Sequence, residues 1–318
     1  MKFTQIDPAV IDVEEERFLI SFDCSLAELK HSIQEVGLLN PPILAGRRDR
    51  PVIVSGRKRI LACLELGLSP IPVFIARDQS DLKLFQLAVF ENVSVRGLSA
   101  VEKAEVLAKL KSFGAADAEL IRRFLPLLKI PPTAEYLDLF LALARYGPEE
   151  KRVVHEKGLS ITVLKTLHPF SPEERALLWP LLRSLGQNRQ KELLILLREI
   201  ARREQVQPLQ LLSEPGITVL REDDTLSAPQ KATKLVDLLR ERRYPSLSSW
   251  TKAFEAVLEK LEIEKGILVD PSPFFEEEDL SLRFTFKNRA EFMARLSGLK
   301  RLAEKPEFDQ LFPSSDDD

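Results

Sequence analysis

A block of three cations stands where an apolar run ends in a small polar turn, in the order Ser55, Gly56, Arg57, Lys58, Arg59. The apolar run predicts a strand, and the helical spacing of the apolar residues that follow predicts a short helix over 57–66. The first turn of that helix would hold the cations beside free backbone N–H groups and the positive end of the helix dipole. Such an arrangement favours a bound anion, above all phosphate. A solvated basic helix end is the alternative that these residues alone leave open.

Two further motifs flank this block. Gly37 opens a Gly-Leu-Leu-Asn-Pro-Pro-Ile segment before it, and Glu91 and Asn92 follow it. In order and spacing, the three motifs resemble the boxes of the N-terminal domain of ParB, the chromosome and plasmid partitioning family. The resemblance covers residues 5–110 well and is weaker up to residue 200. It implies an α+β protein with a ParB/sulfiredoxin-like α/β domain, an all-α middle region and a small α+β C-terminal domain.

The resemblance also implies a ligand for the first domain, namely CTP with a Mg²⁺ ion, and a role for that nucleotide as a switch for DNA partitioning or regulation. The residues that it assigns to nucleotide binding are Gly37, Ser55, Gly56, Arg57, Lys58, Arg59 and Asn92. Glu91 and Asn92 would hold the metal ion through their side-chain oxygens, and Glu91 would be the catalytic group. Whether the protein is an enzyme, a slow CTP hydrolase, is left open.

Three positions depart from the family pattern. Arg57 stands where the family has Glu, and Arg17 lies earlier than expected. The Arg of the third motif is replaced by Val95, with Arg96 one position later. One position is about 100° around a helix, which would move the Arg96 guanidinium off the site unless the backbone changes course. These departures bear on hydrolysis more than on binding.

Other functions also stay open for the same pocket. A phosphotransferase of the serine-kinase type would use Glu91 as a base, and a non-catalytic regulator would keep the fold to bind a partner protein. Glu91 and Asn92 could also simply end a helix, where Asn is common. A sulfiredoxin is excluded, because that enzyme needs a reactive Cys where this chain has Arg57.

Composition predicts a soluble globular protein. Of 318 residues, 44% are hydrophobic and 30% charged, and the net charge is −3, so any basic surface must be local. Two cysteines without metal-ligand spacing and three scattered histidines argue against a disulfide framework and a zinc site. Since no apolar run is long enough to span a bilayer, we expect no membrane partner and a cytoplasmic, nucleoid-associated location.

We expect three domains. Residues 1–97 would form the nucleotide-binding domain, 98–207 a helical domain with a helix-turn-helix-like segment, and 230–312 a C-terminal α+β domain. The segment 208–229 reads as a linker, because prolines and an acidic run interrupt its periodicity. A C-terminal domain without a ligand motif favours self-association as a homodimer or binding of a protein partner.

The predicted recognition helix is unusual for a DNA-binding protein. Helices over 117–129 and 133–145 match the place of the helix-turn-helix in ParB, whose second helix enters the major groove. That second helix presents Glu135 and Asp138, which would repel phosphate. DNA is therefore expected as a weakly selective partner, and the helix-turn-helix as degenerate.

The cations that could bind a DNA backbone lie further along. Residues 151–204 contain eleven cations and six anions, and Arg198, Arg202 and Arg203 share one face of a predicted helix. Such a face could follow phosphates, although a solvated helix face over an apolar one explains it equally.

Overall fold

The computed structural model describes residues 1–22, 25–46, 50–261, 263, 266–271 and 280–312. The chain divides into two compact units, Met1–Arg183 and Ser184–Asp318. No described helix is long and apolar enough to cross a membrane.

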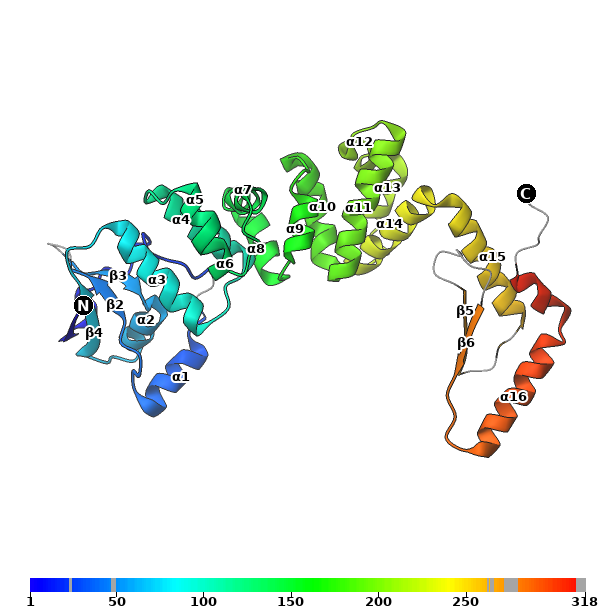
Figure 1. The fold of residues 1–318 in the computed structure, drawn as a ribbon, viewed down its shortest axis with the longest axis horizontal. Coiled ribbons are helices and arrows are strands. Elements are labelled where there is room, and N and C mark those ends of the chain that lie inside the picture. Colours follow the sequence, from blue (N-terminus) through cyan, green and yellow to red (C-terminus); the bar gives the residue numbers. More distant parts are fainter. Residues whose placement is uncertain (23–24, 47–49, 262, 264–265, 272–279, 313–318) are drawn as a thin grey trace. The chain divides into compact units, whose positions relative to one another are not determined.

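A four-stranded sheet begins the first unit (Figure 1). Its strands are β1 (Lys2–Ile6), β2 (Ile43–Ala45), β3 (Val52–Ser55) and β4 (Ile71–Ala76). They lie in the order β1-β4-β2-β3; β2 runs parallel to β4, and the other two pairs are antiparallel. β3 confirms the strand predicted before Ser55. β1 was not predicted, because it is an edge strand whose exposed polar residues show no apolar alternation.

Three helices accompany the sheet: α1 (Ala27–Val36), α2 (Arg57–Glu65) and α3 (Asp81–Val95). α1 packs on α2, and α3 packs on β3. Ile60 and Cys63 of α2 are fully buried against Leu44 and Val73 of the sheet. This apolar core fixes where α2 begins, and it therefore fixes the position of the cations on its first turn.

The rest of the first unit is helical. It contains α4 (Ala100–Ser112), α5 (Asp117–Glu119), η2 (Leu120–Phe124), α6 (Leu125–Leu127), α7 (Ala134–Leu143), α8 (Pro148–Glu156), α9 (Ile161–Leu167) and α10 (Pro172–Ser184). A capping box of Ser99 and Glu102 opens α4. η2 is a turn of π-helix that precedes Pro126, whose ring cannot donate a helical hydrogen bond and would clash with the preceding turn.

The second unit starts with helices and ends with a small hairpin. Its helices are α11 (Gln187–Glu204), α12 (Pro208–Leu212), α13 (Pro215–Glu222), α14 (Ala228–Arg243), α15 (Pro245–Leu261), α16 (Arg289–Ala303) and η4 (Pro306–Leu311). The strands β5 (Ile267–Pro271) and β6 (Leu280–Phe284) pair antiparallel. β6 forms where apolar and polar residues alternate along the chain.

The predicted linker at 208–229 is wrong. Most of it forms α12 and α13, which pack on α11 and α14. Pro208 and Pro215 stand at the first turn of these helices, where proline starts a helix because its missing N–H would have no partner there. The two prolines therefore begin helices and do not mark a linker.

Candidate functional site

A pocket of about 350 Å³ lies where β3 turns into α2, with the last turn of α3 on the opposite side. It brings together six of the predicted ligand-binding residues and the predicted catalytic carboxylate: Ser55, Gly56, Arg57, Lys58, Arg59, Glu91 and Asn92. Gly37 does not line it. Gly37 ends α1 with a φ of 74°, so its backbone geometry accounts for the glycine.

Gly56 makes the turn possible. Its φ is 93°, in the left-handed region that favours glycine. A Cβ atom here would lie 3.0 Å from Cβ of Pro42 and 3.1 Å from the guanidinium of Arg59. The glycine therefore allows the strand to turn sharply and lets the Arg59 side chain lie against the backbone.

Glu91 is held by two donors of the cationic turn. The buried Ser55 hydroxyl donates to Oε2 of Glu91 at 2.5 Å, and Nη2 of Arg59 donates to Oε1 at 2.6 Å. Nη1 of Arg59 also donates to the carbonyl of Asn40 at 2.8 Å. The carboxylate thus occupies two of the donors that a phosphate would use, and a phosphate oxygen could replace it there.

Arg57 and Lys58 keep donors available. The only side-chain contact recorded for Arg57 among the described residues joins its Nη1 to Oε1 of Glu16 at 3.3 Å, and its Nε is buried without a hydrogen-bond partner. Lys58 lines the pocket without a partner among the described residues. Since the Lys58 ammonium group has no acceptor among the described residues, it could donate to an anion in the pocket.

The segment at residues 15–20 forms another wall of the pocket. Phe18 is buried against Phe85 and Phe113, and Nζ of Lys109 donates to the carbonyls of Glu16 at 2.7 Å and Leu19 at 2.9 Å. Burial lowers the pKa of Lys109, although nearby glutamates act in the opposite direction. Lys109 was not predicted to support the site, because its partners lie some ninety residues away in sequence and are backbone atoms.

Arg96 reaches the pocket despite its shifted position. α3 ends at Val95, and Arg96 continues in extended conformation with φ −147° and ψ 159°. The backbone therefore changes course here, which is the condition under which Arg96 could stay at the site. Its guanidinium donates to both carboxylate oxygens of Glu102 at 2.9 Å and to the hydroxyl of Ser21 at 3.1 Å. Burial alone would raise the pKa of Glu102, but hydrogen bonds from Arg96 and the backbone, with the charge of Arg96, lower it below its usual value. Glu102 thus neutralises Arg96.

The predicted pair of metal ligands does not form a metal site by itself. Both oxygens of Glu91 accept hydrogen bonds, and Nδ2 of Asn92 donates to the carbonyl of Ala88 at 2.9 Å. Neighbouring residues on a helix point in different directions, so these two side chains do not converge. Within the described residues, no three His, Cys, Asp or Glu side chains gather around a common point. If a nucleotide brings a Mg²⁺ ion into the pocket, the carboxylate of Glu91 is the group that would hold it.

The predicted recognition helix, α7, carries its acidic residues as expected. Glu135 and Asp138 are exposed. Glu135 pairs with Lys165 of α9 at 3.0 Å, and the same ammonium group lies over the ring of Tyr136. The charge of Glu135 is thus partly compensated by a neighbouring helix, which the local sequence did not reveal.

One arginine of the predicted phosphate-following face on α11, Arg203, makes contacts within the second unit. Arg203 donates to the carbonyls of Arg242 at 2.8 Å and Arg243 at 3.1 Å, which are the last carbonyls of α14. It also pairs with Glu204. Arg203 therefore stabilises the end of a neighbouring helix, which explains this cation without a bound phosphate. Arg198 and Arg202 remain exposed.

Other cations of residues 151–204 are also paired internally. Lys151 pairs with Glu105, Arg175 with Glu150, Arg183 with Glu156, and Arg189 with Asp237. The number of cations in this segment is therefore larger than the number that are free to bind a DNA backbone.

The sheet and the helices packed on it form a small α/β domain. Its pocket is lined by the cationic start of α2, which could bind an anion. Residues 2–93 match the model of the ParB N-terminal domain. This part of the chain belongs to the ParB N-terminal domain family, which confirms the resemblance.

Named relatives agree with that assignment. The chain is 33% identical over 165 residues to the chromosome-partitioning protein Spo0J of Thermus thermophilus, covering 45% of this chain and 61% of that protein. It is 38% identical over 90 residues to a probable chromosome 1-partitioning protein ParB of Deinococcus radiodurans, covering 28% of this chain and 31% of that protein. The chain thus spans less than two thirds of the length of these relatives.

Among solved structures, the chain is similar to C-terminally truncated ParB of Caulobacter crescentus complexed with CTP-gamma-S. The TM-score is 0.26 and the identity 17%, over 54% of this chain and 94% of that one. This likeness is too distant to place a ligand or an element in the present protein.

Proposed function

We propose that the pocket at the start of α2 binds a nucleoside triphosphate, CTP by family resemblance, and that the protein is a ParB-like, DNA-associated partitioning protein of the cytoplasm and nucleoid. The observation that carries the proposal is the set of donors at one turn. Ser55, Arg57, Lys58 and Arg59 all line the same cavity. The apolar residues of that cavity, among them Leu29, would contact the base or sugar.

Calorimetry with the four ribonucleoside triphosphates tests this proposal directly. With Mg²⁺ present, we expect the full-length protein to bind CTP more tightly than ATP, GTP or UTP. Release of inorganic phosphate from the same mixtures would show whether CTP is hydrolysed. If none of the four binds to folded protein, the nucleotide proposal is wrong and a partner-binding regulator becomes the better reading.

The position of Glu91 predicts an unusual response to mutation. Glu91→Gln removes the charge that holds Arg59, so CTP should bind as well as in the wild type or up to about tenfold more tightly, because the guanidinium is freed for phosphate. The dependence of binding on Mg²⁺, and any turnover, should fall, because the carboxylate that could reach the metal is lost. Calorimetry with and without Mg²⁺ measures both effects.

Glu15→Gln is the matched control, since Glu15 also lines the pocket but has no recorded contact with Arg59. A loss of CTP affinity in Glu91→Gln, or the same change in both variants, would contradict this role. Serine-dependent production of ADP, abolished by Glu91→Gln, would instead favour the phosphotransferase alternative.

The second unit supports the proposed self-association. Large apolar side chains are exposed on the hairpin and on or just before α16: Leu268, Leu282, Phe286, Met293 and Leu296. Exposed apolar residues gathered on neighbouring elements are typical of an interaction surface. We therefore propose that the C-terminal part forms the interface of a homodimer or the binding surface for a protein partner.

A further inference from the structure

A second pocket in the first unit, of about 310 Å³, lies between the segment that follows α3 and the end of α6. Three cations line it: Arg96, Lys103 and Lys129. None of the described residues that line it is a carboxylate. A concave site with three cations and no anion in its own wall has a positive potential.

Only two of these charges are free. Arg96 is neutralised by the buried carboxylate of Glu102, as described above. The side-chain ammonium groups of Lys103 and Lys129 have no hydrogen-bond or ion-pair partner among the described residues, although both backbone N–H groups are bonded. Burial lowers the pKa of Lys103, and the positive charge of Lys129 lowers it further, so the two ammonium groups lie close enough to repel each other.

The placement of Lys103 has no explanation within the fold. It stands in the first turn of α4, three residues after Ala100, where the positive end of the helix dipole disfavours a cation. It is also half-buried, so burial adds to the cost of its charge. An anion in the pocket would relieve both effects.

Lys129 faces this position from a special backbone conformation. Its φ is 56°, in the left-handed region where glycine or asparagine is usual. Hydrogen bonds from its N–H to the carbonyl of Pro126, and from the N–H of Ile130 to the carbonyl of Leu125, both at 2.9 Å, hold the turn. The negative end of the helix dipole at the end of α6 explains the cation of Lys129. It does not explain Lys103, the second cation of the pocket.

We propose that Lys103 and Lys129 form a second binding site, which takes a phosphate group. Apolar side chains of Leu98 and Leu127 line the same pocket and would reduce competition from water. The phosphate could come from a nucleic-acid backbone or from a small phosphorylated molecule. The site does not depend on nucleotide binding in the first pocket, although Val95 and Arg96 line both cavities.

The test removes the two charges while preserving the local structure. Lys103→Met keeps an apolar side chain of similar length, and Lys129→Asn tolerates the left-handed conformation. The double variant and the wild type are titrated with pyrophosphate by calorimetry, and with a labelled DNA duplex of arbitrary sequence by anisotropy at several salt concentrations. Lys2→Asn with Lys83→Met is the control, since it makes the same substitutions at exposed positions outside both pockets.

We expect the double variant to lose at least about tenfold in affinity for one of the two ligands, while the control changes less than about twofold. If the ligand is duplex DNA, the salt dependence of log K should also become shallower by about 0.9, the value for one phosphate. The ligand that loses affinity identifies the source of the phosphate. If both ligands bind the double variant as they bind the control, the proposal is wrong.

Two further variants separate loss of binding at the second site from loss of the first site and from loss of the fold. Lys58→Ala with Arg59→Ala should remove binding at the first pocket and leave the second site, so failure of the nucleotide proposal is distinguished from failure of this one. Lys103→Met alone removes an unfavourable charge from the start of α4, so its thermal midpoint should equal or exceed that of the wild type. It should still weaken binding, which separates loss of the ligand from loss of the fold.

Discussion

Replacing Lys58 and Arg59 by alanine together is expected to lower CTP affinity about 10²-fold or more. Each charge-assisted hydrogen bond to phosphate contributes about 1.5–3 kcal/mol when shielded from water, and each 1.4 kcal/mol is about tenfold in affinity. Both side chains line the pocket at the first turn of α2, where the helix dipole adds to their effect. Calorimetry of the full-length protein with CTP and Mg²⁺ measures the loss.

The two residues differ in what their removal leaves behind. Lys58 has no partner among the described residues, so Lys58→Ala tests the phosphate contact alone. Arg59→Ala also leaves Glu91, whose side chain is only 25% exposed, without its cation, so part of its effect would be on the fold. Arg59→Lys keeps the charge and should recover part of the affinity.

Lys83→Ala with Arg122→Ala is the matched control, because it removes one Lys and one Arg from exposed positions outside the pocket. Equal loss in both double variants would mean that net charge, and not this turn, attracts the nucleotide. An unchanged affinity in Lys58→Ala with Arg59→Ala would overturn the assignment of the pocket.

The sequence predicted this turn well because its signals are local. A strand that ends in Ser55, a glycine for the left-handed turn and apolar residues at helical spacing are all contained in a dozen positions, and the structure places β3 and α2 accordingly. The helix α7 and the capping box of α4 were predictable for the same reason.

The partners of the cations could not be predicted in the same way. Glu91 meets Arg59 across 32 positions of sequence, and Arg203 meets the end of α14 across about 40. A helical wheel shows that Arg203 is exposed on its own helix, but it cannot show that another helix ends beside it. Charge counts therefore overestimated the basic surface of residues 151–204. They also missed the two lysines of the second pocket, of which one stands on α4 and the other in the turn after α6.

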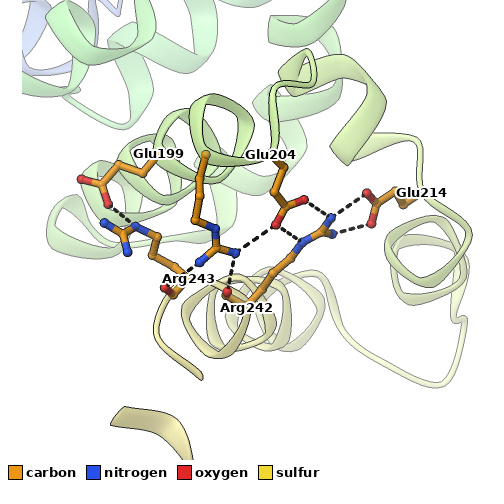
Figure 2. Close-up of polar contacts among 6 residues, drawn as sticks. Glu199, Glu204, Glu214, Arg242 and Arg243 are labelled. Atoms are coloured by element: carbon orange, nitrogen blue, oxygen red, sulfur yellow. Dashed lines mark hydrogen bonds and ion pairs between the residues drawn. The ribbon is translucent and has the colours of Figure 1, made fainter. Parts of the chain in front are cut away.

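The largest effect on stability is expected at Arg242, which joins three segments of the second unit (Figure 2). Its guanidinium pairs with Glu204 at the end of α11 and with Glu214 just before α13. Arg242→Met would leave these two carboxylates without their shared cation. Since all three side chains are partly exposed, we expect a loss of about 1–2 kcal/mol in the free energy of unfolding, larger than for an isolated surface pair because the contacts are bidentate and networked.

The pH dependence of this loss distinguishes an ion-pair network from simple packing. Hydrogen bonds from Arg242 and Arg203 lower the pKa of Glu204 from 4.5 to about 2. A carboxylate with a lowered pKa in the folded state stabilises fully above its unfolded pKa, and this stabilisation is lost as the pH falls towards the folded value. The difference in stability between wild type and Arg242→Met should therefore be largest near neutral pH and should narrow as the pH falls from 4.5 towards 2.

Urea unfolding at about pH 6 and about pH 3.5 measures both quantities. Arg283→Met is the control, because Arg283 pairs with Asp270 in the same unit but is 72% exposed, so its removal should cost little at either pH. A difference between wild type and Arg242→Met that stays constant over this range would assign the loss to the packing of the arginine stem. The network of Glu204, Glu214 and Arg242 would then not be what fastens α13 to the ends of α11 and α14.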